Sequence, residues 1–279
     1  MKRRLWLRAS ILMLVIFIVS LLAYPQAVWA KDKLTLSTGS PYELGLIDAL
    51  AKPFEAKYNC KVDVVKAGSG KAIKLLKEGR VDVIMVHAKK AEEKIIKDGY
   101  GVNRRAVAHN DFVMVGPKKD PAIIKEAKNV TDAYRRIAQS KSLFFSRGDN
   151  SGTHKKEMSI WKKAGIEPKG KWYKTTGKFM GATLKEAGTA RGYFMTDRST
   201  YIYLSKEVNL NLLFEGDPTL VNHYNAIAVN PARYPERNYE LAVNFIGFIT
   251  SPAGQKIIRD YGKKEFGKPL YFADAIPLD

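Results

Sequence analysis

Cysteine, histidine and acidic residues are scarce in this chain of 279 residues. Cys60 is its one cysteine, which excludes an internal disulfide framework and a cysteine-rich zinc site. The four histidines show no metal-binding spacing, so we predict no cation ligands. The chain has 28 Asp and Glu against 47 Lys and Arg, which gives a formal net charge of +19. This excess points to an anionic partner: nucleic acid, a membrane surface or a small anion.

The longest apolar run lies near the N-terminus. Residues 11–23 are apolar apart from Ser20, whereas a membrane span needs ~20 residues. Basic residues precede this run and small Ala30 follows it, which is the order found in a secretory signal. We predict a signal peptide over residues 1–30, cleaved after Ala30, with an uncleaved anchor as the alternative. Cleavage would leave an exported, soluble chain of charge +15, because four of the nineteen excess positive charges lie in the signal.

Strand and helix patterns alternate through the rest of the chain, which predicts an α/β fold with a mostly parallel sheet. Before residue 117 we predict strands at 33–36, 62–65, 81–86 and 112–115, separated by helices at 44–54, 72–78 and 91–97. After it we predict helices at 131–140, 155–164 and 180–187, strands at 143–145, 192–195 and 226–229, and helices at 239–249 and 252–261.

No Gly/Ser-rich linker divides the chain into independent domains. The alternation therefore predicts two α/β units joined by extended strands, with the chain leaving the first unit near Pro117 and returning near Asn225. In this scheme lobe 1 comprises residues 31–116 and 226–279, and lobe 2 comprises residues 117–225.

Three polar loops follow predicted strands, where open α/β sheets bind their ligands. They are Ser37-Thr38-Gly39-Ser40, the stretch from Ser146 to Thr153 that contains Arg147 and Ser151, and the stretch from Thr196 to Tyr201 that contains Arg198. Hydroxyls, guanidinium groups and the free N–H groups of a helix start all suit an anion. The alternatives are helix caps in the first loop, a solvated arginine in the second, and a cap with a local ion pair in the third.

A fourth candidate, the turn Gly68-Ser69-Gly70, superficially resembles a phosphate loop. A nucleotide loop would require Gly at position 65 and Ser or Thr at position 72, where this chain has Val65 and Ala72, so a nucleotide site is rejected.

Catalytic patterns are weak in this sequence. Ser151 and His154 could form a nucleophile and base, but the Gly-x-Ser-x-Gly elbow is absent. His223 and Asn225 are expected to serve turns. Donor-rich loops without a nucleophile, a metal or paired acids favour binding over turnover, so we predict no catalytic residues and a protein that is not an enzyme.

Several longer segments resemble one family. They are VDVIMVHAKKAEEKIIKDGYGVNRR, NDFVMVGP, SRGDNSGTHKKE, MGATL, TDRSTY, EGDP, NAIAVNP and FITSPAGQKII. In this order they are similar to the tungstate-binding proteins of bacterial tungstate ABC transporters, which are type II periplasmic solute-binding proteins. The resemblance runs from about Leu34 to Phe272.

The resemblance implies two lobes joined by hinge strands, with an oxyanion held in the cleft between them. The family's Thr-Thr-Thr-Ser loop stands here as Ser37-Thr38-Gly39-Ser40, so one hydroxyl is lost at Gly39. The family's Gly-Thr-Gly turn keeps a hydroxyl at Ser69, and its two arginines map onto Arg147 and Arg198. The oxyanion ligands expected from the loops and the resemblance together are Ser37, Thr38, Gly39, Ser40, Ser69, Arg147, Ser151, Thr153 and Arg198.

The resemblance further implies a monomer in the periplasm that has no cofactor, binds tungstate and delivers it to a permease in the inner membrane. Tungstate is a tetrahedral dianion that only accepts hydrogen bonds, so its site should present donors. Sulfate has the same charge and shape but is smaller, so the size of the cavity must select between them. A binding protein of the same class for molybdate, sulfate or phosphate is the alternative. An exported phosphate-ester hydrolase and a nucleic-acid binder are the alternatives from other classes. Export and the lack of aromatic residues among the scattered lysines argue against nucleic acid.

Overall fold

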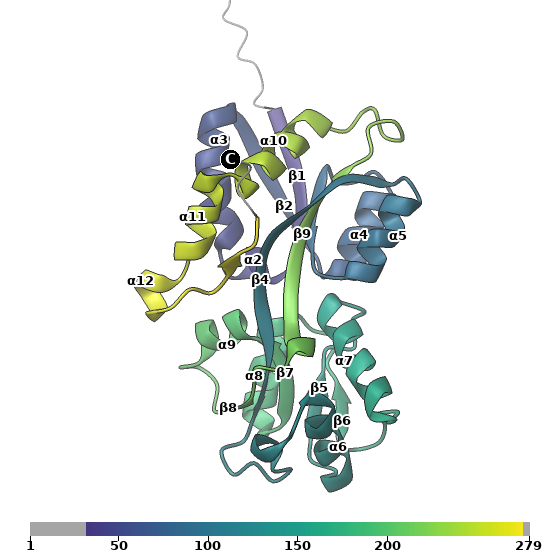
Figure 1. Ribbon diagram of the computed structural model, residues 1–279, viewed down its shortest axis with the longest axis vertical. Coiled ribbons are helices and arrows are strands. Elements are labelled where there is room, and N and C mark those ends of the chain that lie inside the picture. The colour runs from purple at the N-terminus through teal and green to yellow at the C-terminus, as the bar shows by residue number, and fades with distance from the viewer. Residues whose placement is uncertain (1–31, 276–279) are drawn as a thin grey trace, which may run out of the picture. The chain divides into compact units, whose positions relative to one another are not determined.

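The structure, a computed structural model, describes residues 32–275 (Figure 1). The predicted signal peptide and its cleavage site lie outside these residues. Parallel strands β1 (Asp32–Thr38), β2 (Cys60–Lys66) and β3 (Val83–Val86) begin the first lobe, with β1 between the other two. Side chains of a strand alternate between the faces of its sheet. Accordingly, Val83 and Met85 join one apolar core while Ile84 and Val86 join another on the opposite face.

Helices cover both faces of this first sheet (Figure 1). Helices α3 (Leu46–Tyr58), α10 (Tyr239–Thr250) and α11 (Pro252–Asp260) pack in the core that contains Val83 and Met85. Helices α4 (Ser69–Lys77) and α5 (Lys89–Lys97) pack in the other core. Short helices α2 (Ser40–Glu43) and α12 (Lys263–Phe266) complete this lobe.

The second lobe is built on β5 (Phe144–Ser146), β6 (Tyr173–Thr175), β7 (Tyr193–Asp197) and β8 (Asn211–Phe214). Its helices are α6 (Val130–Ser140), α7 (Gly152–Ala164), α8 (Met180–Ala190) and α9 (Arg198–Leu204), with 3₁₀ turns at Ile124–Glu126 and Pro218–Leu220. Its core is aromatic: the ring centroid of Trp161 lies 4.4 Å from that of Tyr134 and 5.2 Å from that of Phe144. These rings anchor α6 and α7 against β5.

Two long antiparallel strands connect the lobes, as Figure 1 shows. Strand β4 (Gly101–Gly116) pairs with β9 (Val221–Val229) from Gly101 to Asp111, and with β7 from Phe112 to Val115. Strand β9 also pairs with β3 of the first lobe. A short strand β10 (Phe272–Ala273) pairs with β4 at His109. The chain therefore crosses from one lobe to the other within hydrogen-bonded strands, which suits a hinge.

The structure corrects three expectations about secondary structure. The sheet is not mostly parallel, because β4 and β9 run through its middle and make antiparallel pairs. Strand β4 begins at Gly101, well before the predicted strand at 112–115. The sequence pattern did not predict the first part of β4 because its residues are polar and partly exposed. His223 and Asn225 lie in strand β9, not in turns. The predicted lobe boundaries at residues 117 and 225 stay predictions.

The predicted loops are also shorter than expected. Ser37 and Thr38 end strand β1, and α2 begins at Ser40. Helix α4 already begins at Ser69, and α7 at Gly152. Polar residues that read as loops therefore lie at strand ends and in first helical turns.

Candidate functional site

The N-terminal ends of helices α4 and α7 meet between the two lobes (Figure 1). Gly68 caps α4 and Ser151 caps α7. They lie so close that a Cβ on Gly68 would be 3.0 Å from the Cβ of Ser151 and 3.7 Å from Nη2 of Arg147. Each helix N-terminus carries a partial positive charge and N–H groups without helical acceptors. Two such ends beside a guanidinium concentrate positive potential where an anion would be stabilised.

Arg147 extends from the end of β5 into this contact and is 4% exposed. Its Nε and Nη2 atoms donate to Oδ2 of Asp149 at 3.1 and 2.5 Å, and the guanidinium lies 5.6 Å from the ring of Phe179. Burial alone would raise the pKa of Asp149, but the charge of Arg147 and hydrogen bonds from Ser151 lower it on balance. Asp149 is therefore ionised, and it fixes the direction of the guanidinium fork.

Three hydroxyls of the predicted set lie at these helix ends, and those of Thr153 and Ser69 have a hydrogen that no described residue accepts. Thr153 is 1% exposed, and its Oγ1 has no hydrogen-bond partner among the described residues. Oγ of Ser69 accepts from the backbone N of His87 at 3.3 Å, so its own hydrogen remains for donation. The hydroxyl of Ser151 is engaged twice, because its Oγ accepts from the backbone N of His154 as the cap of α7 and the side chain hydrogen-bonds to Asp149. A buried hydroxyl without a partner is unfavourable, so the position of Thr153 favours a bound acceptor.

The hydroxyls of the first loop are used differently. Ser37 donates to the carbonyl of Val65 at 2.9 Å, and Thr38 donates to the carbonyl of Met85 at 2.7 Å. Both side chains are fully buried and bind the strands on either side of β1. These two hydroxyl hydrogens therefore already have acceptors in the protein.

Gly39 and Ser40 continue the same loop into the contact between the lobes. A Cβ on Gly39 would be 3.3 Å from the carbonyl O of Ala67, so the two backbone segments approach closely. Ser40 belongs to the first lobe, yet its Oγ donates to Oδ2 of buried Asp197 in the second lobe at 3.4 Å. Ser40 therefore joins the lobes near the site.

Arg198, the second predicted arginine, is held by carboxylates. Its Nε and Nη2 donate to the two oxygens of Asp111 at 2.6 and 2.5 Å, and Nη2 lies 2.6 Å from a carboxylate oxygen of Glu215. These bonds raise the pKa of Arg198. Because Asp111 lies on the connecting strand β4, Arg198 ties α9 to that strand.

His87 is a site residue that the sequence analysis gave no role. Its ring lies against Gly152 across the lobe contact, and its buried Nδ1 has no hydrogen-bond partner among the described residues. Burial, with a smaller contribution from the charge of Arg147, lowers the pKa of His87 to about 4. The imidazole is therefore neutral near pH 7 with a single N–H, and its ring also hydrogen-bonds to the side chain of Asn222. His87 directly follows strand β3, and this position at a strand end is the sequence feature that it shares with the three polar loops.

The arrangement of Ser151 and His154 does not resemble a nucleophile and its base. Ser151 accepts from the backbone N of His154, whereas the ring Nδ1 of His154 accepts from the backbone N of Asn150 at 3.0 Å. The imidazole is thus engaged with the backbone before the helix.

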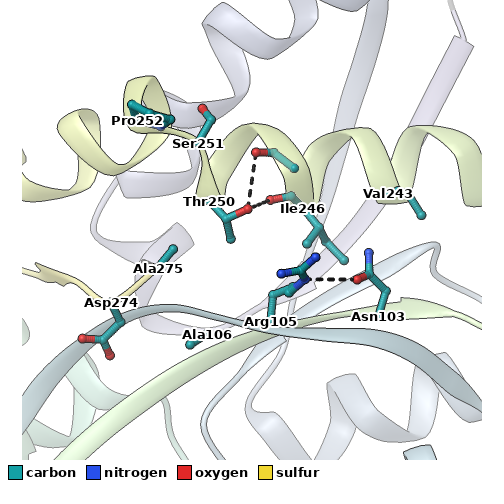
Figure 2. Close-up of a pocket in the computed structure, with 11 residues that line it drawn as sticks. Asn103, Arg105, Ala106, Val243, Ile246, Thr250, Ser251, Pro252, Asp274 and Ala275 are labelled. Carbon is teal, nitrogen blue, oxygen red and sulfur yellow. Dashed lines mark hydrogen bonds between the residues drawn. The ribbon is translucent and has the colours of Figure 1, made fainter. Parts of the chain in front are cut away.

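A basic cavity of about 660 Å³ opens beside His87 and Gly152. The cationic residues that line it are Lys89, Lys90, Arg104, Lys155 and Lys156. Another cavity, of about 570 Å³, lies between α10 and the start of β4 and is drawn in Figure 2. None of the nine predicted ligand residues lines either of these two cavities.

Comparisons with known proteins agree with this architecture. The family model of the PBP superfamily domain matches residues 25–253. The tungstate-binding protein TupA of Peptoclostridium acidaminophilum is 36% identical over 284 residues, which cover 99% of each chain. A crystal structure titled as the tungstate ABC transporter from Geobacter sulfurreducens is 46% identical, with a TM-score of 0.75 over 82% of this chain and 99% of that one.

The structure of the tungstate-binding protein TupA from Desulfovibrio alaskensis is 40% identical, with a TM-score of 0.73 over 88% of this chain and 100% of that one. Within residues 32–275, the structure has no helix that is long and apolar enough to cross a membrane. These findings confirm the two-lobed α/β fold and the predicted family. The chain belongs to the PBP superfamily and, within it, to the family of ABC-transporter solute-binding proteins that includes these relatives.

Proposed function

We propose that this protein is the periplasmic receptor of a tungstate ABC transporter, which captures tungstate between its lobes and delivers it to a permease in the inner membrane. One observation carries this proposal. The N-terminal ends of α4 and α7 meet at buried Arg147, and the first turn of α7 holds the hydroxyl of Thr153, which has no partner in residues 32–275. The relatives named for tungstate, one of them matching over 99% of this chain, identify the anion.

The site has the chemistry that a tetrahedral dianion requires. Tungstate accepts hydrogen bonds through four oxygens, and the lobe contact presents a guanidinium, hydroxyls and backbone N–H groups. We propose that Arg147, Ser69, Ser151 and Thr153 bind the oxyanion directly, together with the amides at the starts of α4 and α7. In the tautomer that carries its hydrogen on Nδ1, neutral His87 would add a further N–H donor.

The remaining predicted residues support this site from its edges. Ser37 and Thr38 place their hydroxyls on neighbouring strands, so we propose that they position the loop and offer the anion backbone groups. Gly39 and Ser40 bring that loop against the second lobe. Arg198 acts through Asp111, by holding α9 on the connecting strand.

The proposal includes an exported monomer with no catalytic step and no cofactor. The basic cavity beside His87 would raise the local concentration of anions and steer a dianion to the closing lobes. The hydrogen bond between Ser40 and Asp197 and the close approach of the two helix caps describe the closed form, and an open form would replace both with contacts to solvent.

Calorimetric titration of residues 31–279, which contain the compact unit that begins at Asp32, tests the proposal. Tungstate should bind with one-to-one stoichiometry and micromolar or tighter affinity, and sulfate and phosphate should compete weakly. Molybdate, which shares the charge and shape of tungstate, is the second candidate. A preference for sulfate or phosphate over both metal oxyanions, or the absence of binding heat and thermal shift with all four, would reject the proposal.

A further inference from the structure

Two histidines far apart in the sequence meet on the strands that connect the lobes. His109 on β4 and His223 on β9 are direct cross-strand partners, and their ring centroids lie 5.6 Å apart. The carboxylate of Asp274, which follows β10, lies between them. Nδ1 of His109 is 2.5 Å from one of its oxygens, and Nδ1 of His223 is 2.9 Å from the other.

Figure 2 shows the Asp274 carboxylate directed away from Arg105 and Thr250, the side chains of the neighbouring cavity. Phe272 stacks on the ring of His109 at 5.0 Å and fixes its orientation. The carboxylate thus serves the two histidines, and the potential ligand atoms of the three residues all lie within 4.8 Å of one another.

We propose that His109, His223 and Asp274 form a binding site for a divalent transition-metal cation such as Zn²⁺. Imidazole nitrogen and carboxylate oxygen are the ligands that zinc takes at about 2.0–2.2 Å. In the structure the two Nδ1 atoms share hydrogen bonds with the carboxylate. A cation would take the place of those hydrogens after small outward shifts of the three side chains.

The surroundings also suit a metal site. The side chain of His223 is 62% exposed, which gives a cation an entry path and leaves room for water as a further ligand. The side chain of Asp274 is only 17% exposed, so its carboxylate is held in place. Bound metal would join β4, β9 and the C-terminal segment where the strands pass between the lobes. This site is separate from the proposed oxyanion site and does not depend on it.

The test is a calorimetric titration of ZnCl₂ into residues 31–279, purified without a histidine tag, treated with EDTA and then dialysed. Tungstate is omitted, because it would precipitate zinc. We expect about one zinc per chain and a rise in Tm with ZnCl₂. His223→Ala and Asp274→Asn should each weaken zinc binding by at least about tenfold, as loss of one of three ligands predicts.

His154→Ala is the matched control, because it removes one imidazole elsewhere and should leave zinc binding unchanged. Exposed His223 can be replaced without disturbing the core, so the His223→Ala result remains decisive if Asp274→Asn fails to fold. Absence of heat and of any Tm change at about 100 µM ZnCl₂ would overturn the proposal. The proposal would also be overturned if His223→Ala bound zinc as tightly as the unmodified chain does.

Discussion

Arg147 and Thr153 show how single residues divide the work at the lobe contact. Arg147 is buried and oriented by Asp149, so its fork is fixed before any ligand arrives. Thr153 has a buried hydroxyl that the described residues leave unpartnered. Thr38 is equally buried, but its hydroxyl is bonded to Met85. We therefore expect different effects from replacing Thr38 and Thr153, because the protein already accepts the hydroxyl hydrogen of Thr38 but not that of Thr153.

Replacement of Arg147 should sharply weaken oxyanion binding. In Arg147→Ala the affinity for tungstate should fall about 100-fold or more, because a charge-assisted donor is lost and Asp149 is left unpaired beside the anion. Arg147→Lys keeps the positive charge but lacks the planar guanidinium fork, so its affinity for tungstate should lie between those of the unmodified chain and Arg147→Ala. The exposed Lys155→Ala, in the first turn of α7, is the control, and calorimetric titration compares the three. Equal losses in Arg147→Ala and Lys155→Ala would show that diffuse charge, not a direct contact, governs affinity.

Thr153→Val should mainly lower the affinity for tungstate, whereas Thr38→Val should mainly lower the stability of the fold. Thr153→Val removes an unpartnered hydroxyl at nearly constant shape, so stability should be unchanged or slightly higher while tungstate affinity falls about tenfold. Thr38→Val removes the donor to Met85 and should lower the free energy of unfolding by about 1–2 kcal/mol. Urea unfolding and titration of both variants measure the two quantities. A clear loss of stability in Thr153→Val would show that its hydroxyl is structural.

At the scale of elements, helix α7 combines a ligand-binding end with a buried acid in its middle. Glu157 is 1% exposed, and its Oε1 accepts from Tyr173 at 2.7 Å and from Trp161 at 3.2 Å. Burial outweighs these hydrogen bonds and raises the pKa of Glu157 to about 7. The carboxyl is therefore protonated in the folded protein at pH values where the unfolded chain has released its proton.

This raised pKa predicts a pH dependence of stability. Between pH 4.5 and about 7 the folded state binds one more proton at Glu157 than the unfolded state, so its contribution to stability declines as pH rises. Relative to Glu157→Gln, which imitates the protonated acid, the unmodified chain should lose about 3 kcal/mol between pH 4 and pH 8.

Urea unfolding of both proteins at several pH values, without ligand, checks this expectation. His87 titrates in the opposite sense. Its pKa of about 4 lies below the ordinary value of 6.5, so the contribution of His87 to the stability of the fold rises with pH between about 4 and 6.5. Because both proteins contain His87, the difference between them isolates Glu157. Parallel stability profiles would contradict a raised pKa at this position.

At the scale of the whole molecule, the two lobes depend on close backbone approach where they meet. Gly152 begins α7 in the second lobe, and the ring of His87 in the first lobe lies directly against its Cα. A Cβ at this position would be 2.7 Å from Nδ1 of His87, closer than real Cβ contacts allow. The glycine is thus required by the approach of the lobes and not by the helix itself.

Gly152→Ala should hold the lobes apart. We expect tungstate affinity to fall at least about tenfold, because closure would force the methyl group into the imidazole. Small-angle scattering with saturating tungstate should show a less compact protein than the unmodified chain. Gly247→Ala in α10 is the matched control, since a Cβ there meets nothing within 4 Å. Affinity equal to that of the unmodified chain in Gly152→Ala would show that the lobes close without this contact.

The class of fold and the kind of binding chemistry could both be predicted from the order of residues along the chain. Helix and strand periodicities are local, so the alternation of elements could be predicted, as could the polar residues at the ends of β1, β5 and β7. The family resemblance also came from local motifs. The first part of β4 was not predicted because its polar, partly exposed residues do not show the alternation of apolar and polar residues that marks a strand.

Which of these donors are available, and which groups they face, depends on how the strands and helices pack together. Thr38 and Thr153 read alike in sequence, but partners from distant strands use one hydroxyl and leave the other unpartnered. Arg198 is bound by carboxylates 87 and 17 positions away, whereas Arg147 points between the lobes. His109 and His223 form a pair only because β4 and β9 are antiparallel neighbours. Competition for hydrogen bonds is settled by residues far apart in the chain, and spacing along the sequence does not contain that information.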